Sequence, residues 1–169
     1  ELPIPATYFK YKRLITSRGC PAACIYCDTP QLWGQRVRFR TPENVVDELE
    51  MLHKKHGISF FIMSDDTFTF IKKRTIEICK EIIKRNLKIT WDCRSRVNFV
   101  CEERLRWMKK AGCVTISYGI ESGSQKMLNT MKKGTRIEQI KKAAELTRSF
   151  GYNLNFFIIV GAPGETDDT

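Results

Sequence analysis

The chain has 169 residues, of which 42% are hydrophobic and 28% are charged, and its formal net charge is +10. This length predicts one domain with a single substantial core. The composition is that of an ordinary globular chain, which excludes a disordered or fibrous protein. The sequence contains no apolar run approaching the roughly 20 residues of a membrane-spanning helix.

The positive charge would suit a polyanionic partner. However, the basic residues are spread over every predicted helix, in pairs such as Lys54-Lys55 and Lys109-Lys110, and form no stripe that alternates with aromatic residues. Nucleic-acid binding is therefore a minority interpretation. Seven cysteines are an odd number, and nothing resembles a secretory signal peptide. A disulfide framework is disfavoured, and a reducing cytoplasm is favoured.

Short apolar runs alternate with longer amphipathic segments, a pattern typical of strand–helix units around a parallel sheet. Five strands are predicted, near residues 11–17, 58–64, 87–93, 114–120 and 153–160. Helices are predicted over residues 42–56, 72–85, 102–111 and 124–131, and a longer helix opens with a capping box at Thr135–Glu138 and stops at Gly151.

An eight-unit parallel barrel needs about 250 residues, or about 31 per unit, so a chain of this length holds about five units. The predicted fold is therefore an α/β domain with a parallel sheet that lacks its closing unit. We expect a domain that is incomplete at its C-terminus, as in a piece of a longer protein.

Three cysteines follow the first predicted strand, Cys20, Cys24 and Cys27, with the spacing Cys-x-x-x-Cys-x-x-Cys. Iron–sulfur clusters are normally held by four cysteine thiolates, so three thiols leave one iron of a cubane free for an outside ligand. An open coordination position is typical of a catalytic metal site. A zinc site would need a fourth ligand, and neither His53 nor His56 is suitably spaced. Buried, inert cysteines are the other alternative, which a loop containing glycine and proline disfavours.

Polar or glycine-rich segments also follow the other four predicted strands. These segments are Ser64–Thr67, Arg94–Arg96, Glu121–Gly123 and Gly161–Glu165. In parallel strand–helix folds, functional groups lie on the loops at the carboxyl ends of the strands. We therefore expect these segments and the cysteine loop to meet at one edge of the sheet.

The sequence resembles the radical S-adenosylmethionine (SAM) superfamily, and within it the cobalamin-dependent branch. The resemblance rests on residues 17–30 together with the segments Val45–Leu49, Asp65–Phe68, Trp91–Arg96, Ile116–Ser124 and Gly161–Thr166. It covers nearly the whole chain and implies a partial (β/α)6 barrel, truncated here to about five units, over residues 11–169. Residues 1–10 would be the tail of a linker from an N-terminal cobalamin-binding domain outside this chain.

The resemblance implies that Cys20, Cys24 and Cys27 ligate three irons of a 4Fe-4S cluster and that SAM binds the free iron. It further implies reductive cleavage of SAM to a 5'-deoxyadenosyl radical, for methyl transfer or related carbon chemistry such as ring formation. The cofactor would carry this chemistry, while the protein orients the reactants and excludes water. An external electron donor such as flavodoxin or ferredoxin and a small-molecule or lipid-like substrate are also implied.

Contacts to SAM are implied at individual positions. Tyr26 would lie near the adenine, with packing within the loop as the alternative. Asp65 and Asp66 stand where many relatives have a Gly-Gly-Glu motif that accepts hydrogen bonds from the SAM ammonium group, and carboxylates suit that partner. The glycines are missing here, and an Asx turn or helix cap is the alternative role for the two aspartates.

Four more positions are implied in the same way. Glu121 would contact the ribose or the methionine part of SAM, and Lys133 would face its carboxylate. Gly161 would contact the adenine through its backbone. Arg94 would bind the SAM carboxylate or instead neutralise Asp92.

Two other functions share parts of this pattern. A methylthiotransferase acting on transfer RNA or a ribosomal protein has the same cysteine spacing, but the Asp65–Phe68 segment and the lack of an RNA-binding module disfavour it. A non-catalytic metal-binding fragment is the second alternative. The other cysteines, Cys79, Cys93, Cys101 and Cys113, are scattered and predict core packing, not an auxiliary cluster.

Overall fold

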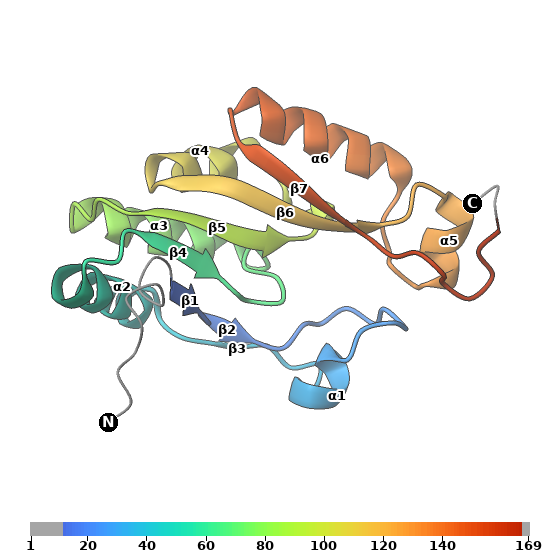
Figure 1. The fold of residues 1–169 in the computed structure, drawn as a ribbon, viewed down its shortest axis with the longest axis horizontal. Coiled ribbons are helices and arrows are strands. Elements are labelled where there is room, and N and C mark those ends of the chain that lie inside the picture. The colour runs from blue at the N-terminus through green and yellow to red at the C-terminus, as the bar shows by residue number, and fades with distance from the viewer. Residues whose placement is uncertain (1–11, 167–169) are drawn as a thin grey trace.

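A computed structural model describes residues 12–166. It contains a five-stranded sheet in the order β1-β4-β5-β6-β7, in which every neighbouring pair is parallel (Figure 1). The predicted α/β fold with five parallel strands is confirmed. The strands are β1 (Lys12–Leu14), β4 (Phe60–Met63), β5 (Thr90–Ser95), β6 (Cys113–Glu121) and β7 (Asn153–Ile158).

Four helices connect these strands and lie along one face of the sheet (Figure 1). They are α2 (Pro42–His56), α3 (Lys72–Lys84), α4 (Glu102–Lys110) and α6 (Ile137–Ser149). The predicted limits of α2 are confirmed: the Thr41 hydroxyl accepts the Asn44 amide at 3.2 Å, and Gly57 ends the helix in the left-handed conformation. Over the described residues, the helices are too short or too polar to cross a membrane.

The core lies between these helices and the sheet. Its largest fully buried side chain is Trp91 on β5, whose indole N–H donates to the Ala111 carbonyl at 2.8 Å. The Phe68 ring packs edge-on against Trp91, with centroids 5.3 Å apart. Both aromatic rings are buried, and the indole nitrogen, the polar atom of the pair, has a hydrogen-bond partner. This packing fixes β5 against its neighbours. The carboxyl ends of the strands point toward α1 (Thr29–Trp33) and α5 (Gln125–Thr130) in Figure 1.

The first predicted strand is wrong in its extent. Its predicted first residue, Tyr11, and the predicted linker at residues 1–10 lie outside the described residues. The described part divides into β1 and β2 (Ser17–Arg18), and β2 pairs antiparallel with β3 (Arg38–Phe39) in a separate small sheet. The break occurs because the Thr16 amide donates to the Asp65 carboxylate at 2.6 Å, which removes a backbone donor from the main sheet.

Other boundaries also differ. The third strand is predicted over residues 87–93 but runs from Thr90 to Ser95. The short helix α1 (Thr29–Trp33) was not predicted. The predicted capping box at Thr135–Glu138 is wrong: the Thr135 hydroxyl donates to Asn98, and the side chain of Gln139 accepts the Arg136 amide at 2.8 Å. Tertiary contacts to the loop after β5 therefore set the start of α6.

Buried tyrosine phenols and cysteine thiols in the core predict that the free energy of unfolding falls at alkaline pH. Burial raises the pKa of the Tyr118 and Tyr152 phenols above 10.0 and of the Cys79 and Cys113 thiols above 9.0. Above these ordinary pKa values the unfolded chain loses protons that the folded chain keeps. The free energy of unfolding is therefore unaffected by these groups below about pH 9 and declines as the pH rises further. Urea unfolding between pH 8 and pH 11 checks this. Tyr152→Phe should reduce the slope above pH 10, and a constant free energy of unfolding would contradict the expectation.

Candidate functional site

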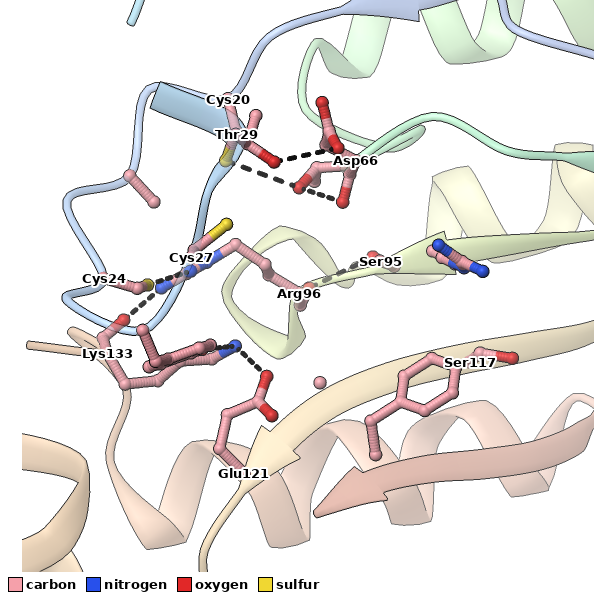
Figure 2. A pocket seen from close by; sticks show the side chains of 16 residues that line it. Cys20, Cys24, Cys27, Thr29, Asp66, Ser95, Arg96, Ser117, Glu121 and Lys133 are labelled. Carbon is pink, nitrogen blue, oxygen red and sulfur yellow. Dashed lines mark hydrogen bonds and ion pairs between the residues drawn. The ribbon is translucent and has the colours of Figure 1, made fainter. Parts of the chain in front are cut away.

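The three cysteines line one cavity at the carboxyl ends of the strands (Figure 2). The cavity has a volume of about 280 Å³. Cys20 and Cys24 are buried, and Cys27 is partly buried. The predicted convergence at one edge of the sheet is confirmed for the segments after β4 and β5 and for the end of β6, since the cavity is also lined by Asp66, Thr67, Arg94, Ser95, Arg96, Ser117, Gly119 and Glu121. It is not confirmed for Gly161–Glu165 after β7, none of which lines the cavity.

The path of the cysteine loop is set by backbone contacts at both ends. Gly19, with φ +98°, lies so close to the next segment that a Cβ there would be 2.7 Å from the Arg36 carbonyl oxygen, so only glycine fits. At the far end, the Ile25 amide donates to the Met131 carbonyl at 3.2 Å, just beyond α5 (Gln125–Thr130). The loop therefore joins the first strands to the connection between α5 and α6.

A buried ion pair forms another part of the cavity wall. The Lys133 ammonium lies 2.7 Å from Glu121 Oε1 and donates to the Tyr26 hydroxyl at 3.0 Å (Figure 2). Lys133 is 4% exposed and Glu121 8%, so both charges are largely removed from water. The structure thus brings together three side chains that the sequence singled out on separate segments.

Local backbone geometry holds this pair in place. Glu121 adopts φ +66°, an uncommon conformation for a residue with a side chain, where the pairing of β6 with β7 is irregular. A Cβ at Gly119 would overlap the Glu121 carboxylate, so glycine leaves the space that the carboxylate occupies. Burial, followed by the Glu121 charge and then Cys24, raises the pKa of Tyr26. The phenol therefore stays protonated and neutral near Lys133.

The two aspartates after β4 have different surroundings. Asp65 is 1% exposed, and its oxygens accept from the Thr16 amide, the Thr16 hydroxyl and the Ser17 hydroxyl at 2.5–2.6 Å. Asp65 does not line the cavity, and these contacts to residues far away in the sequence are neither an Asx turn nor a helix cap. Asp66 is exposed, lines the cavity, and accepts the Thr29 hydroxyl at 3.1 Å.

Arg94 and Gly161 also differ in placement. Arg94 lines the cavity, and its guanidinium lies 5.8 Å from the centre of the Phe157 ring. Burial raises the pKa of Asp92, whose Oδ1 is buried without a hydrogen-bond partner. Gly161, with φ +81°, does not line this cavity, and its amide donates to Glu165.

Sequence reasoning passed over Arg96 as a site residue. Its guanidinium donates to Cys24 Sγ at 3.2 Å and to the Lys133 backbone carbonyl (Figure 2). It was visible in the sequence only as a member of the Arg94–Arg96 segment after a strand. Thr67 was also not singled out, and its hydroxyl lies 3.9 Å from Cys20 Sγ.

The donor set fits an iron–sulfur cubane better than a single metal ion. Within residues 12–166, no three His, Cys, Asp or Glu side chains converge to hold one ion. In a cubane each cysteine ligates a different iron, so the sulfur atoms need not meet at a point. Three thiols around one cavity, with no fourth, suit a cluster with an open iron. Such an α/β domain, with a cysteine loop at the carboxyl end of its first strand, defines a class of cluster-binding partial barrels.

The profile of the Radical SAM superfamily matches residues 14–169, and the chain belongs to this family. The family implies a 4Fe-4S cluster and SAM as cofactors. An uncharacterized methyltransferase of Pyrococcus horikoshii is 38% identical over 98% of this chain. The chain spans only 39% of the length of that relative.

Two solved structures share the fold. TsrM from Kitasatospora setae, a radical SAM methyltransferase with cobalamin and a [4Fe-4S] cluster bound, has a TM-score of 0.88 and 24% identity, over 96% of this chain and 34% of that chain. OxsB, a cobalamin-dependent SAM radical enzyme with aqua-cobalamin and SAM bound, has a TM-score of 0.76 and 29% identity, over 87% of this chain and 23% of that chain. The cobalamin-dependent branch therefore supplies relatives of this chain, as the sequence resemblance implied.

Proposed function

We propose that the chain is the core of a cobalamin-dependent radical SAM enzyme that cleaves SAM reductively and transfers a methyl group. Cys20, Cys24 and Cys27 would hold three irons of the cluster. The observation that carries the proposal is one cavity that places all three thiols beside the buried Glu121–Lys133 pair. A structural metal site would have no need of a charged pair beside it.

The chain's own residues would bind and orient SAM. A carboxylate suits the SAM ammonium group and a cation suits its carboxylate, because both are charge-assisted contacts. Glu121 and Asp66 are the carboxylates on the cavity wall, and Lys133 and Arg94 are cations there. Tyr26, held by Lys133, would present its ring to the adenine. When bound, a reduced cluster supplies one electron to the SAM sulfonium, which yields methionine and a 5'-deoxyadenosyl radical.

The remaining parts of the proposal lie outside the described residues. Because reductive cleavage leaves the methyl group on methionine, a cobalamin-binding domain N-terminal to this chain would take a methyl group from a second SAM molecule, which would leave as S-adenosylhomocysteine, and pass it to the substrate. Residues 1–10 would belong to the linker. TsrM and OxsB, which bind cobalamin, support this part. An external one-electron donor such as a flavodoxin or ferredoxin would reduce the cluster. The substrate would be a small or lipid-like molecule.

The test uses the full-length protein, reconstituted anaerobically with iron and sulfide. We expect visible absorption from the cluster, a change in its electron paramagnetic resonance (EPR) signal on adding SAM, and release of 5'-deoxyadenosine and methionine after reduction. If the protein contained zinc, or if the EPR signal of its cluster did not change on adding SAM, the proposal would be refuted and a non-catalytic metal site favoured.

A further inference from the structure

Arg96 connects the cysteine loop to the segment that carries Lys133. One guanidinium nitrogen, Nη1, donates to Cys24 Sγ at 3.2 Å, and the other, Nη2, donates to the Lys133 backbone carbonyl. The side chain is partly buried and comes from the end of β5, between the two segments that it joins (Figure 2). Among the residues that the structure describes, Arg96 is the cation that hydrogen-bonds to one of the three thiols.

The contact to Cys24 has a chemical consequence if the thiol is a cluster ligand. A donor hydrogen bond from a cation stabilises negative charge on the sulfur. Reduction of the cluster by an outside one-electron donor adds one negative charge and breaks no bond. Hydrogen bonds to the sulfur atoms and nearby charge are among the factors that set the reduction potential of such clusters. A guanidinium beside Cys24 therefore favours the reduced form.

We propose that Arg96 is a positioning residue that holds the Cys24 sulfur in the cluster site and raises the reduction potential of the cluster. This inference rests on the proposed function, since it takes Cys24 as an iron ligand. The planar guanidinium reaches two acceptors at once, the sulfur and the carbonyl, which a lysine ammonium at the end of a flexible stem does not reproduce.

The segment around Lys133 has other supports, so removing Arg96 should leave the fold intact. The Asn98 side chain donates to the Gly134 carbonyl at 2.9 Å, and the Thr135 hydroxyl donates to Asn98. The Ile25 amide still holds the loop to Met131. Substitution of Arg96 therefore tests its effect on the cluster, and not merely whether the chain folds.

The experiment compares Arg96→Gln and Arg96→Lys with the wild type in the reconstituted full-length protein. The readouts are iron bound per chain and a potentiometric titration of the reduced cluster followed by EPR. In Arg96→Gln we expect the ratio of reduced to oxidised cluster at the wild-type midpoint to fall roughly tenfold, or about 59 mV for one electron. Arg96→Lys keeps the charge and should recover part of this loss. Arg148→Gln, on the exposed side of α6, is the matched control.

The outcomes separate the inference from the function. A wild-type protein that binds no cluster refutes the proposed function. Wild-type iron content and an unchanged midpoint in Arg96→Gln overturn the role of Arg96 and leave the function standing. Loss of iron in Arg96→Gln together with a smaller loss in Arg96→Lys, which keeps the charge but not both contacts, supports the holding of Cys24, provided that urea unfolding of the cluster-free variants matches the wild type. An equal change in Arg148→Gln would overturn the inference as a general charge effect.

Discussion

Replacing Lys133 with methionine is expected to lower the free energy of unfolding of the cluster-free chain by about 3–5 kcal/mol. The reason is that Glu121, 8% exposed, would keep its buried charge while losing the ammonium 2.7 Å away. Methionine nearly matches lysine in length and removes only the charge and its hydrogen bonds, including the one to Tyr26. Urea unfolding at neutral pH measures the effect.

The matched controls isolate the charge. Lys126→Met, on the exposed face of α5, should change the free energy of unfolding by less than about 0.5 kcal/mol. The double variant Lys133→Met with Glu121→Gln no longer carries an unpaired charge, so about 1–3 kcal/mol of the single-variant loss should return. If Lys133→Met were as stable as Lys126→Met, the Glu121–Lys133 pair would not be the buried contact described above.

If the chain cleaves SAM as proposed above, replacing Cys24 with alanine is expected to abolish this reaction, because the cluster would lose one of its three protein ligands. Iron bound after anaerobic reconstitution should fall to the background level of the cluster-free protein. The SAM-dependent change in the EPR signal should disappear with it. The free energy of unfolding of the cluster-free chain should shift by only about 1 kcal/mol, since a single sulfur atom is removed from a loop.

Cys101→Ser is the appropriate comparison for this variant. Cys101 precedes α4, lies outside the cavity, and is partly buried like Cys27. Serine is favoured at the first capping position of a helix, so Cys101→Ser should fold and bind iron as the wild type does. Retention of a SAM-responsive cluster in Cys24→Ala, or loss of the cluster in Cys101→Ser, would contradict the assignment of the cysteine loop.

The strand–helix alternation was predicted well because it depends on local patterns. The limits of the α2 helix are set by residues at its own ends, Thr41, Pro42 and Gly57, and these limits are confirmed. The first strand was not predicted in its true extent, because Asp65, far away in the sequence, takes the Thr16 amide. No pattern of neighbouring residues predicts such a contact. The same is true of the hydrogen bond from the Thr135 hydroxyl to Asn98, which displaces the start of α6.

The candidate site divides in the same way. The three cysteines could be singled out from their spacing, because the proposed ligation of one cluster by a short loop requires ligands that are close in the sequence. The choice between Arg94 and Arg96 could not be made from the sequence, since the two residues lie two positions apart near the end of one strand. Only the fold shows that Arg94 lies beside Phe157, whereas Arg96 reaches Cys24.

The sequence by itself determined that this chain folds into parallel strand–helix units and carries three closely spaced cysteines, for which we propose a cluster with an open position. Periodicity, caps and spacing are local properties, and they suffice for those conclusions. The tertiary structure decided which charges are buried and which groups meet. Lys133 reads as a solvated surface residue in the sequence, yet it is 4% exposed beside Glu121, because burial depends on segments that fold together from distant parts of the chain.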